Sequence, residues 1–330
     1  MGEKRYVIGI DGGGTKTDCV VAELGGRIVG FSRMGGSNHQ IDGIETAMEN
    51  VSRAVDEACG HAGIRREEVA FAFLGMAGAD LPEDFALLRA HLPLTPIPFE
   101  FVNDSWIAFF AEAQQDWGAV SICGTGANLG VLKPDGSLLS VRALGYMLGN
   151  FGGGQQLAET ALHFAFRDSE GTGEPTLLSL RLPEICGCET MDELALRIYR
   201  SDYRYPREFP VPKLVFDLAN EGDAVCLRIL QRHGEELGEM LGRLMTRAGL
   251  AEQAVPVVLS GSLYTRDTNR RMLKPLQTRL SAFVPRATCT LIRSQPVLGA
   301  LFRSFSAVGK RLPAEQKQAL KEQLAAIPGL

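Results

Sequence analysis

The chain has 330 residues, of which 45% are hydrophobic and 22% charged, and a formal net charge of −5 at pH 7, which favours a globular protein of two domains. The acidic balance and the lack of a basic block argue against a nucleic-acid partner. No apolar run reaches the ~18 residues of a membrane span, and the first residues lack the apolar stretch of a secretory signal, so we expect no membrane partner.

The first third of the chain alternates strand and helix patterns, which is typical of the α/β class. The apolar spacing predicts, in order, strands at 6–11, 15–24 and 27–33, a helix at 41–60, a strand at 69–75, a helix at 83–91, a strand at 98–102 and a helix at 105–115. Gly25 and Gly26 predict a hairpin turn between the second and third strands.

The strand pattern begins again at residue 118. Residues 119–144 read as strand, turn, strand, Asp-Gly hairpin and strand, so they repeat the organisation of residues 6–33, with Thr125 in the place of Thr15. We therefore expect an N-terminal domain at 1–117 and a related C-terminal domain at 118–330. The second carries helical insertions, and its last helix can pack back on the N-terminal domain.

The rest of the chain is mostly helical by pattern. The spacing predicts helices at 155–166, 190–200, 223–249 and 313–327, and a strand within 255–264 that ends in a Gly-Ser turn. Leucines and methionines on one stripe of the 223–249 helix predict a core or dimer face. The Pro- and Gly-rich segments 171–188 and 203–212 predict connections.

A glycine-rich turn separates the first two predicted strands and has the composition of an anion site. It consists of Asp11, Gly12, Gly13, Gly14, Thr15, Lys16 and Thr17. Glycines let backbone N–H groups approach a ligand closely, and the hydroxyls and the lysine add donors and charge, which suits phosphate. The turn leads into a strand and lacks the G-x-x-x-x-G-K-[ST] spacing, so it is neither a P-loop nor a dinucleotide fingerprint.

A second turn of this kind, Gly124-Thr125-Gly126, follows the first strand of the repeat. Two such turns opening two similar domains would hold one polyphosphate from both sides. A carboxylate beside phosphates is repelled unless a cation separates them, so Asp11 predicts a Mg²⁺ ion that is bound partly through water. The plain alternative is a pair of structural hairpins, the first with a capping aspartate.

Asp104 follows the strand at 98–102 and stands at or before a helix start. One interpretation is a helix N-cap, which is common. The other is a general base that accepts the proton of a substrate hydroxyl at the floor of a cleft. We expect the helix N-terminus to keep the pKa of Asp104 low, and phosphoryl transfer tolerates a weak base because its loose transition state depends more on orientation.

The ordered set of these motifs resembles the N-acetylglucosamine kinase and BadF/BadG/BcrA/BcrD-type ATPase family, within the actin-like ATPase superfamily. The resemblance runs from about residue 6 to about residue 305 and includes the segments GGSNHQ, LGMAGAD, LGYMLGNFGGG, EGDAVCLRILQRHGEELG and QPVLGALFRS. It implies an α/β fold of two ribonuclease-H-like domains with a central nucleotide cleft. It also implies ATP and Mg²⁺ as cofactors, an amino sugar such as N-acetylglucosamine as substrate, and a homodimer.

The resemblance implies a role for each matching position. The first phosphate motif is Asp11 to Thr17, with Asp11 at Mg²⁺; the second is Gly124, Thr125 and Gly126; Gly261 and Ser262 match the adenosine turn. Asp104 matches the general base. The sugar side is implied for Asn38, Gly78, Asn103, Asn128, Gly145 and Asn150.

One stretch departs from the family pattern. The sugar kinases usually carry Gly-Asp-Glu-Gly-Ser, whose aspartate binds sugar hydroxyls, where this chain has Gly149-Asn150-Phe151-Gly152-Gly153. Asn150 still donates and accepts hydrogen bonds, but it supplies no charge, and Phe151 replaces an acid with an apolar ring. The departure indicates a substrate other than N-acetylglucosamine or a weaker affinity for it.

Two other functions compete with the kinase. An activator ATPase would share the phosphate motifs but hold an iron–sulfur cluster, for which the cysteines form no convincing ligand set; an ATP-binding sensor would give Asp104 and Asn38 no role. The seven cysteines are scattered and odd in number, which favours free thiols in a reducing cytosol. Cys186 and Cys188 also allow a zinc site, although a tetrahedral site needs four ligands.

Overall fold

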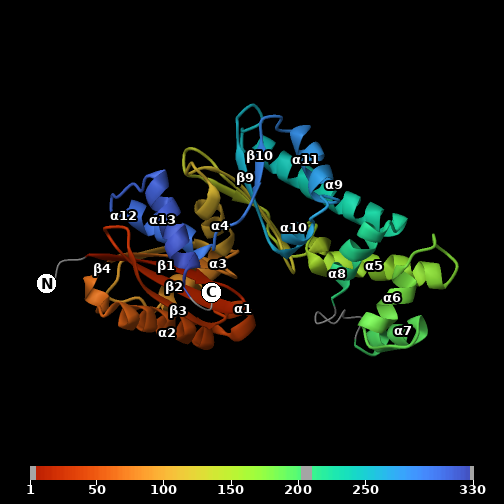
Figure 1. The fold of residues 1–330 in the computed structure, drawn as a ribbon, viewed down its shortest axis with the longest axis horizontal. Helices are drawn as coiled ribbons and strands as arrows, with labels where there is room; N and C mark the ends of the chain where they lie inside the picture. The colour runs from red at the N-terminus through yellow and green to blue at the C-terminus, as the bar shows by residue number, and fades with distance from the viewer. Residues whose placement is uncertain (1–4, 202–209, 328–330) are drawn as a thin grey trace. The chain divides into compact units, whose positions relative to one another are not determined.

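The computed structural model describes residues 5–201 and 210–327, which form two compact units. Unit 1 comprises Met1–Asp116 together with Ile292–Leu330, and unit 2 comprises Trp117–Leu291. Figure 1 shows the elements of each unit along the chain. Most of the connection predicted at 203–212 lies outside the described residues.

Unit 1 is built on a five-stranded sheet in the order β3-β2-β1-β4-β5. Its strands are β1 (Tyr6–Gly12), β2 (Lys16–Glu23), β3 (Ile28–Gly35), β4 (Val69–Met76) and β5 (Phe99–Asn103). The first three form an antiparallel meander, and β4 and β5 run parallel to β1. All five strands were predicted, with ends within two residues of those observed.

Helices cover both faces of this sheet. They are α1 (His39–Asp42), α2 (Ile44–Ala62), α3 (Pro82–His91), α4 (Asp104–Glu112), α12 (Val297–Ala307) and α13 (Ala314–Ala325), with a 3₁₀ turn at Arg66–Glu68. Because successive strand residues point to opposite faces, Ile8 and Ile10 pack in the core with α2, whereas Val7 packs in a second core with α12. The helices predicted at 41–60, 83–91, 105–115 and 313–327 are confirmed with shifted ends.

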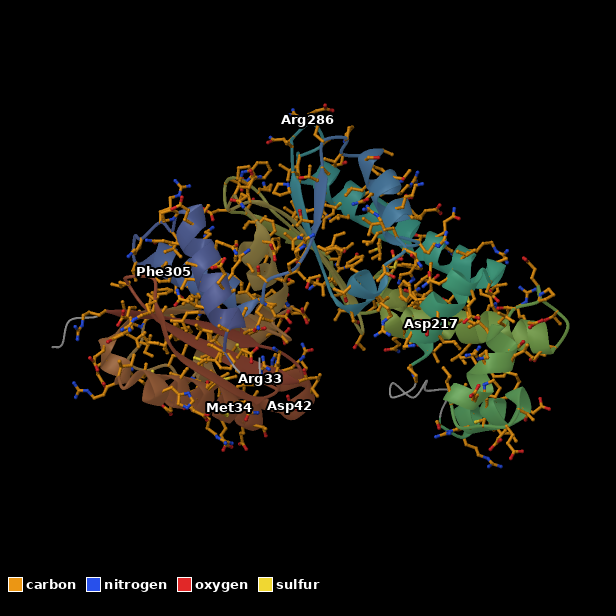
Figure 2. All side chains as sticks on the ribbon, viewed as in Figure 1. Arg33, Met34, Asp42, Asp217, Arg286 and Phe305 are labelled. Atoms are coloured by element: carbon orange, nitrogen blue, oxygen red, sulfur yellow. The ribbon has the colours of Figure 1, made fainter. Side chains whose placement is uncertain are left out.

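The last segment of the chain completes unit 1. Leu298, Leu301 and Phe305 of α12 are buried against Val7 and Val20 of the sheet, and α13 adds Leu320 and Leu324 to the same cluster; Phe305 is labelled in Figure 2. Without α12 this apolar face of the sheet would be exposed to water. The structure therefore differs from a C-terminal domain at 118–330, because residues 292–330 belong to unit 1.

Unit 2 contains a second five-stranded sheet with the order β10-β9-β6-β7-β8. Its strands are β6 (Gly118–Cys123), β7 (Ala127–Leu132), β8 (Leu138–Ser140), β9 (Pro256–Ser260) and β10 (Thr288–Leu291). Here too an antiparallel meander comes first, and two later strands join it in parallel on the side of its first strand. The predicted repeat is thus confirmed, since both sheets have the same strand order and directions.

One large apolar core joins the helices of unit 2 to its sheet. They are α5 (Gly154–Ser169), α6 (Leu178–Ile185), α7 (Met191–Arg200), α8 (Val211–Glu221), α9 (Ala224–Arg247), α10 (Ser262–Arg266) and α11 (Leu273–Ser281), with a 3₁₀ turn at Tyr146–Leu148. The prediction of a plain connection at 171–188 is wrong, because Leu178 and Leu182 of α6 are fully buried. Burial of the leucines outweighs the breaking tendency of Pro183 near the helix end.

The leucine stripe of α9 belongs to the core, as Leu230, Leu237 and Leu241 are fully buried.

All seven cysteines carry free thiols. Within the described ranges, no helix combines the length and the apolar character that a membrane span requires.

Candidate functional site

The parallel strands of unit 1 bring the predicted acidic residues to one edge of the sheet. Asp11 of β1 is in register with Gly75 of β4, and Met76 of β4 is in register with Asn103 of β5. Asp104 follows Asn103 directly. The carboxyl ends of parallel strands in α/β sheets are where ligands bind, so this edge is the candidate site of unit 1.

The first glycine turn closes at this edge through backbone hydrogen bonds. The Gly13 amide donates to the Lys16 carbonyl at 2.9 Å, the Ser37 amide to the Gly13 carbonyl at 2.9 Å, and the Ala77 amide to the Gly12 carbonyl at 2.8 Å. These bonds join the turn to the loop before α1 and to the end of β4. Gly14 and Thr15 remain exposed, so their backbone is accessible to a ligand.

Lys16 lies in the first glycine turn but binds a carboxylate of the protein. Its Nζ is 2.5 Å from Oδ2 of Asp18, which is 1% exposed. Arg33, labelled in Figure 2, donates to the same carboxylate from Nε at 2.6 Å and from Nη2 at 2.9 Å. Two cations thus compensate one buried charge, which the sequence did not predict. Lys16 is 43% exposed, so part of the side chain still faces solvent.

Asp11 and Asp104 are neighbouring carboxyl groups with raised pKa values. Burial raises the pKa of Asp11 to about 7, and the negative charges of Asp104 and Asp18 add to this, against Lys16 and Arg33. Burial also raises the pKa of Asp104 to about 6, with a further contribution from Asp80. The predicted low pKa of Asp104 is wrong: the amides at the start of α4 lower it, but loss of hydration outweighs them.

Asn103, rather than Asp104, is the N-cap of α4. Its Oδ1 accepts hydrogen bonds from the Ser105 amide at 3.0 Å and from the Ser105 hydroxyl at 2.5 Å. Its Nδ2 donates to Oδ1 of Asp80 at 2.9 Å. Asn103 therefore both caps the helix and fixes the second carboxylate beside Asp104. Asp80 was missed in the sequence, where it stands inside the conspicuous segment LGMAGAD without a motif of its own.

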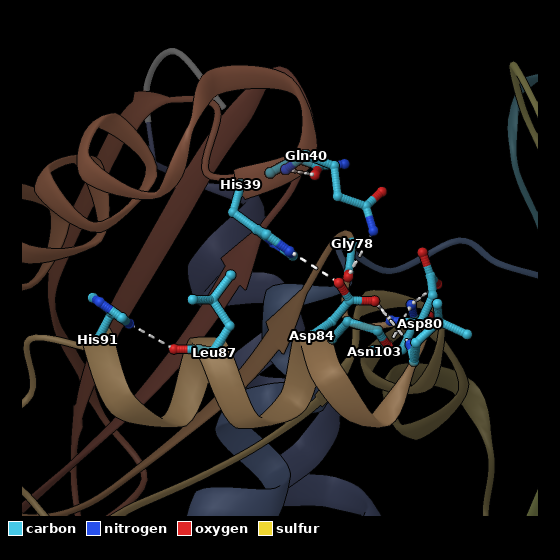
Figure 3. A network of polar contacts seen from close by, with 11 residues as sticks. His39, Gln40, Gly78, Asp80, Asp84, Leu87, His91 and Asn103 are labelled. Atoms are coloured by element: carbon cyan, nitrogen blue, oxygen red, sulfur yellow. Dashed lines mark hydrogen bonds and ion pairs between the residues drawn. The ribbon is translucent and has the colours of Figure 1, made fainter.

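A network of polar contacts holds the predicted sugar-side residues of unit 1 (Figure 3). Oδ1 of Asn38 accepts the Gln40 amide at 2.9 Å, and Nε2 of Gln40 donates to the Gly78 carbonyl at 3.2 Å. Nε2 of His39 lies 3.2 Å from Oδ1 of Asp84, which also accepts the Leu81 amide through Oδ2 at 2.9 Å. These bonds tie the loop before α2 to the turn after β4.

Gly78 is required where Asn38 approaches this turn. Its φ is +82°, and an added Cβ would lie 2.6 Å from Oδ1 of Asn38. No other residue type fits without displacing the asparagine. The structure thus brings together Asn38, Gly78, Asn103 and Asp104, all four predicted to lie on the sugar side.

In unit 2 the second glycine turn sits against the start of α5. The Gly124 amide donates to the Gly126 carbonyl at 2.9 Å, the Gly154 amide to the Gly124 carbonyl at 2.7 Å, and the Gln155 amide to the Thr125 carbonyl at 3.0 Å. Thr125 and Gly126 are exposed. The turn is held by its neighbours while its tip stays open.

Gly261 packs directly on this turn. Ile122 of β6 pairs with Ser260 of β9, so Gly261 follows at the same sheet edge as Gly124. Its φ is +114°, and a Cβ there would lie 2.3 Å from the Cys123 carbonyl oxygen. Ser262 begins α10. The predicted adenosine turn and second phosphate turn are therefore adjacent within unit 2.

In unit 2, Asn150 contacts Gly145 and also Ala127, the residue that precedes Asn128. The Asn150 amide donates to the Gly145 carbonyl at 3.1 Å, and Nδ2 of Asn150 donates to the Ala127 carbonyl at 2.8 Å. Oδ1 of Asn150 is buried without a hydrogen-bond partner among the described residues. This oxygen is an acceptor that a ligand hydroxyl can satisfy.

Phe151 packs in an aromatic cluster next to that loop. Its ring centroid lies 5.0 Å from that of His233 on α9 and 6.3 Å from that of Tyr146. Burial lowers the pKa of His233 to about 4, so the imidazole is neutral at pH 7. The apolar replacement at position 151 is thus matched by a neutral neighbour.

The carboxyl groups of unit 1 would fit a Mg²⁺ ion whose other ligands are water molecules and phosphate oxygens. Among the described residues, no group of three or more His, Cys, Asp or Glu side chains is arranged to hold a metal, and this includes Cys186 and Cys188. Mg²⁺ is usually bound by one or two carboxylates plus substrate phosphates. The raised pKa of Asp11, caused by burial and by like charges, indicates a carboxylate that a cation would compensate.

The sequence model of the BadF/BadG/BcrA/BcrD ATPase family matches residues 8–302. The chain belongs to this family. The match spans both units and every residue predicted to bind nucleotide or sugar.

Individual relatives and a solved structure agree with this assignment. The chain is 27% identical over 276 residues to an N-acetylmuramic acid/N-acetylglucosamine kinase of Clostridium acetobutylicum, covering 82% of this chain and 90% of that protein. It is 27% identical over 271 residues to an N-acetyl-D-glucosamine kinase of Dictyostelium discoideum, covering 78% and 85%. A crystal structure of a candidate N-acetylglucosamine kinase from Chromobacterium violaceum superposes with a TM-score of 0.66 at 20% identity, covering 90% and 98%. That structure shares the fold.

Proposed function

We propose that the protein is an ATP-dependent kinase that transfers the γ-phosphate of ATP to a hydroxyl of an amino sugar, N-acetylglucosamine or a related hexosamine. The observation that carries the proposal is the carboxyl group of Asp104, which has a raised pKa and lies at the sheet edge beside Asp11 and the asparagines of the polar network. Both curated relatives with long matches are named as kinases of N-acetylated sugars.

In this proposal Asp104 is the general base. It orients the sugar hydroxyl toward the γ-phosphate and takes its proton, for which a pKa of about 6 is better suited than an ordinary aspartate value. At neutral pH most of the carboxyl group is ionised and ready to accept a proton. Asn103 caps α4, so the helix does not require Asp104 as its N-cap.

The nucleotide roles fall to the glycine turns. The phosphates of ATP are assigned to Gly12, Gly13, Gly14, Thr15 and Lys16 in unit 1 and to Gly124, Thr125 and Gly126 in unit 2. Thr17 was also predicted to bind phosphate, but it is fully buried and its hydroxyl donates to the Gly35 carbonyl at 2.8 Å, so it joins β2 to β3 instead. Gly261 and Ser262 are assigned to adenosine. Asp11 would hold Mg²⁺, which when bound offsets the negative charge of the phosphates and of this carboxylate.

The sugar contacts fall to Asn38, Gly78, Asn103 and Asp104 in unit 1 and to Asn128, Gly145 and Asn150 in unit 2. Asparagine side chains donate and accept at once, which suits hydroxyls. We further propose that the enzyme acts in the cytoplasm, where its free thiols remain reduced, and as a homodimer.

A coupled assay with Mg-ATP and a panel of hexoses, hexosamines and N-acetylhexosamines tests the proposal. We expect turnover with at least one amino sugar in the panel, and turnover of the same sugar about 10²–10⁴-fold slower in the Asp104→Asn variant. ATP hydrolysis that is independent of every sugar, or equal turnover by the variant, would contradict it.

A further inference from the structure

A polar cavity lies within unit 1, at the end of α4 opposite to Asp104. Its volume is about 190 Å³, and its walls come from the C-terminal end of α4, the following loop, α12 and the segment leading into α13. Its lining includes Phe110, Gln115, Asp116, Arg303, Arg311 and Lys317. A helix of nine residues is about 13 Å long, so this cavity is separate from the predicted catalytic edge.

The ionisable groups that line this cavity are predominantly cationic. Arg303, Arg311 and Lys317 face a single acid, Asp116, which leaves a net charge of +2 on the walls. Burial lowers the pKa of Lys317. The nearby cations Lys321 and Arg311 lower this pKa further, whereas Asp116 raises it. The cavity thus has more positive charge than its own acid compensates.

Two buried donors at the cavity also lack an acceptor. Nε of Arg303 and Nε2 of Gln115 are buried and have no hydrogen-bond partner among the described residues. Nη1 of Arg303 is 3.8 Å from Oδ1 of Asp116, which is beyond hydrogen-bond distance. Buried donors without acceptors are costly, so a ligand that supplies acceptors would be stabilising here.

Arg303 is nevertheless held in place. Its guanidinium lies over the ring of Phe110, 4.8 Å from the centroid, and over the ring of Phe73, 5.7 Å from the centroid. Stacking on two aromatic rings fixes the plane of the guanidinium before a ligand arrives. A planar, pre-positioned guanidinium is the group that binds the oxygens of phosphate bidentately.

We propose that this cavity binds a phosphate dianion, either inorganic phosphate or a phosphate monoester. A phosphate monoester carries a charge of about −1.5 to −2 at pH 7, and the dianion of either ligand matches the +2 of the walls, whereas one carboxylate would leave half of it uncompensated. The volume accommodates a tetrahedral ion with several waters. The proposal of a phosphate monoester as the ligand rests on the proposed function, since a sugar phosphate is the product of a sugar kinase. The proposal of inorganic phosphate does not depend on that function.

Isothermal titration calorimetry without nucleotide tests the site, with inorganic phosphate and glucosamine 6-phosphate as separate probes. Arg311→Gln/Lys317→Gln should weaken binding of the preferred probe about tenfold, the effect of losing roughly one charge-assisted hydrogen bond. The matched control is Arg53→Gln/Arg65→Gln, which removes two exposed cations of the same unit outside the cavity and should leave binding unchanged.

Asp116→Asn supplies a test of opposite sign. Removing the single acid of the walls should strengthen phosphate binding about threefold or more, because it raises their positive charge. A general loss of stability cannot imitate a gain in affinity, so this variant keeps the test valid if the double variant fails to fold.

Equal affinity in wild type, Asp116→Asn and the double variant would overturn the proposal. A loss of phosphate binding in Lys16→Gln, but not in the cavity variants, would also overturn it, because the ion would then occupy the glycine turn. Binding is measured without turnover, so a failure of the proposed kinase activity remains distinguishable from a failure of this site.

Discussion

At the start of α4, two adjacent side chains have separate roles. Asn103 satisfies the amide of Ser105 and so provides the capping contribution of about 1 kcal/mol that an asparagine typically gives. Asp104, one residue later, is spared this role. The sequence alone left Asp104 open between a cap and a base, and the hydrogen bonds of Asn103 favour the base.

Asp104→Asn should lower kcat about 10²–10⁴-fold, because the variant cannot accept the proton of the sugar hydroxyl. The dissociation constant of ATP, measured by calorimetry, should be unchanged. The control is Asp56→Asn, which changes an exposed carboxylate on α2 paired with Arg66 and should keep full activity. A loss of less than a few-fold in Asp104→Asn would remove this residue from the role of base.

The pH dependence of kcat should reveal the raised pKa of Asp104. The base is active when ionised, so kcat should rise with pH through about 6 and fall about tenfold per unit below it. Asp80 contributes to this pKa, so Asp80→Asn should move the acidic limb to lower pH. A limb at the same pH in the variant would show that Asp80 does not influence the base.

The ionised carboxyl group of Asp11 should lower the free energy of unfolding at alkaline pH in the absence of ligand. Its carboxyl group titrates at about 7 when folded and at about 3.9 when unfolded, so stability is lost as the pH rises between these values. Asp11→Asn should therefore raise Tm at pH 8 by several degrees, at roughly 2–4 °C per kcal/mol. Scanning calorimetry should find this gain small at pH 4, and an equal gain at both pH values would contradict the assignment.

These pKa values could not be predicted from the sequence. The position of Asp104 after a strand and at a helix start was evident, but the sign of its shift depends on burial, which neighbouring residues in the chain do not determine. Lys16 gives a similar case, because its partner Asp18 becomes a buried carboxylate only once β2 pairs with β3 and brings Arg33 beside it.

At the level of elements, three glycines of α9 set its distance from α11. Gly234, Gly238 and Gly242 are spaced by four residues and therefore lie on one face. Added Cβ atoms would lie 2.1 Å from the Met272 carbonyl oxygen, 2.4 Å from that of Leu276 and 2.7 Å from the Phe283 ring. The two backbones approach as closely as the absence of side chains allows.

Gly238→Ala should destabilise the protein by about 1–3 kcal/mol, because the two helices must separate to admit the methyl group. Gly60 of α2 is the matched control, since a Cβ there meets nothing within 4 Å. Gly60→Ala should stabilise by up to about 1 kcal/mol through helix propensity. Chemical denaturation measures both, and equal signs for the two variants would refute a packing role for Gly238.

Amphipathic spacing made some helices predictable, although α4 was predicted despite its burial, and α11, which buries leucines on one face only, was missed. α2 and α9 alternate exposed and buried residues at helical spacing and were predicted. α12 is buried along most of its length between the sheet and its neighbours, so it has no polar stripe to reveal its period. Pro183 indicated a connection but lies inside α6, and Pro212 indicated one but lies in the first turn of α8. β10 was not predicted, because its four residues are too few to reveal a strand pattern.

At the level of the molecule, the recurrence of a three-stranded meander was predictable from the sequence. What the sequence could not fix is the return of the chain to unit 1 after Leu291. That return depends on the fit of α12 against β1, where an added Cβ at Gly9 would lie 2.4 Å from the Leu301 amide nitrogen. The predicted roles of the site residues stay predictions, although those of each unit lie close together within it.

Leu301→Ala should destabilise unit 1 by about 2–5 kcal/mol, since this fully buried side chain covers Val7 and Val20. Leu241→Ala should do the same to unit 2, where Leu241 is fully buried. Amide hydrogen exchange should find protection lost mainly in β1 and β2 for the first variant and in β6 and β7 for the second. Loss of protection in the opposite unit alone would contradict the division of the chain.

Unit 1 consists of two segments that are separated in the sequence by unit 2, so the ribosome synthesises them at different times. Residues 1–116 emerge first, but their sheet waits for α12 while the 175 residues of Trp117–Leu291 are made. At bacterial and eukaryotic elongation rates this wait is about 10–35 s. Throughout it, the Val7 and Val20 face has no cover, so the nascent chain should be a client of chaperones that bind apolar segments until translation ends.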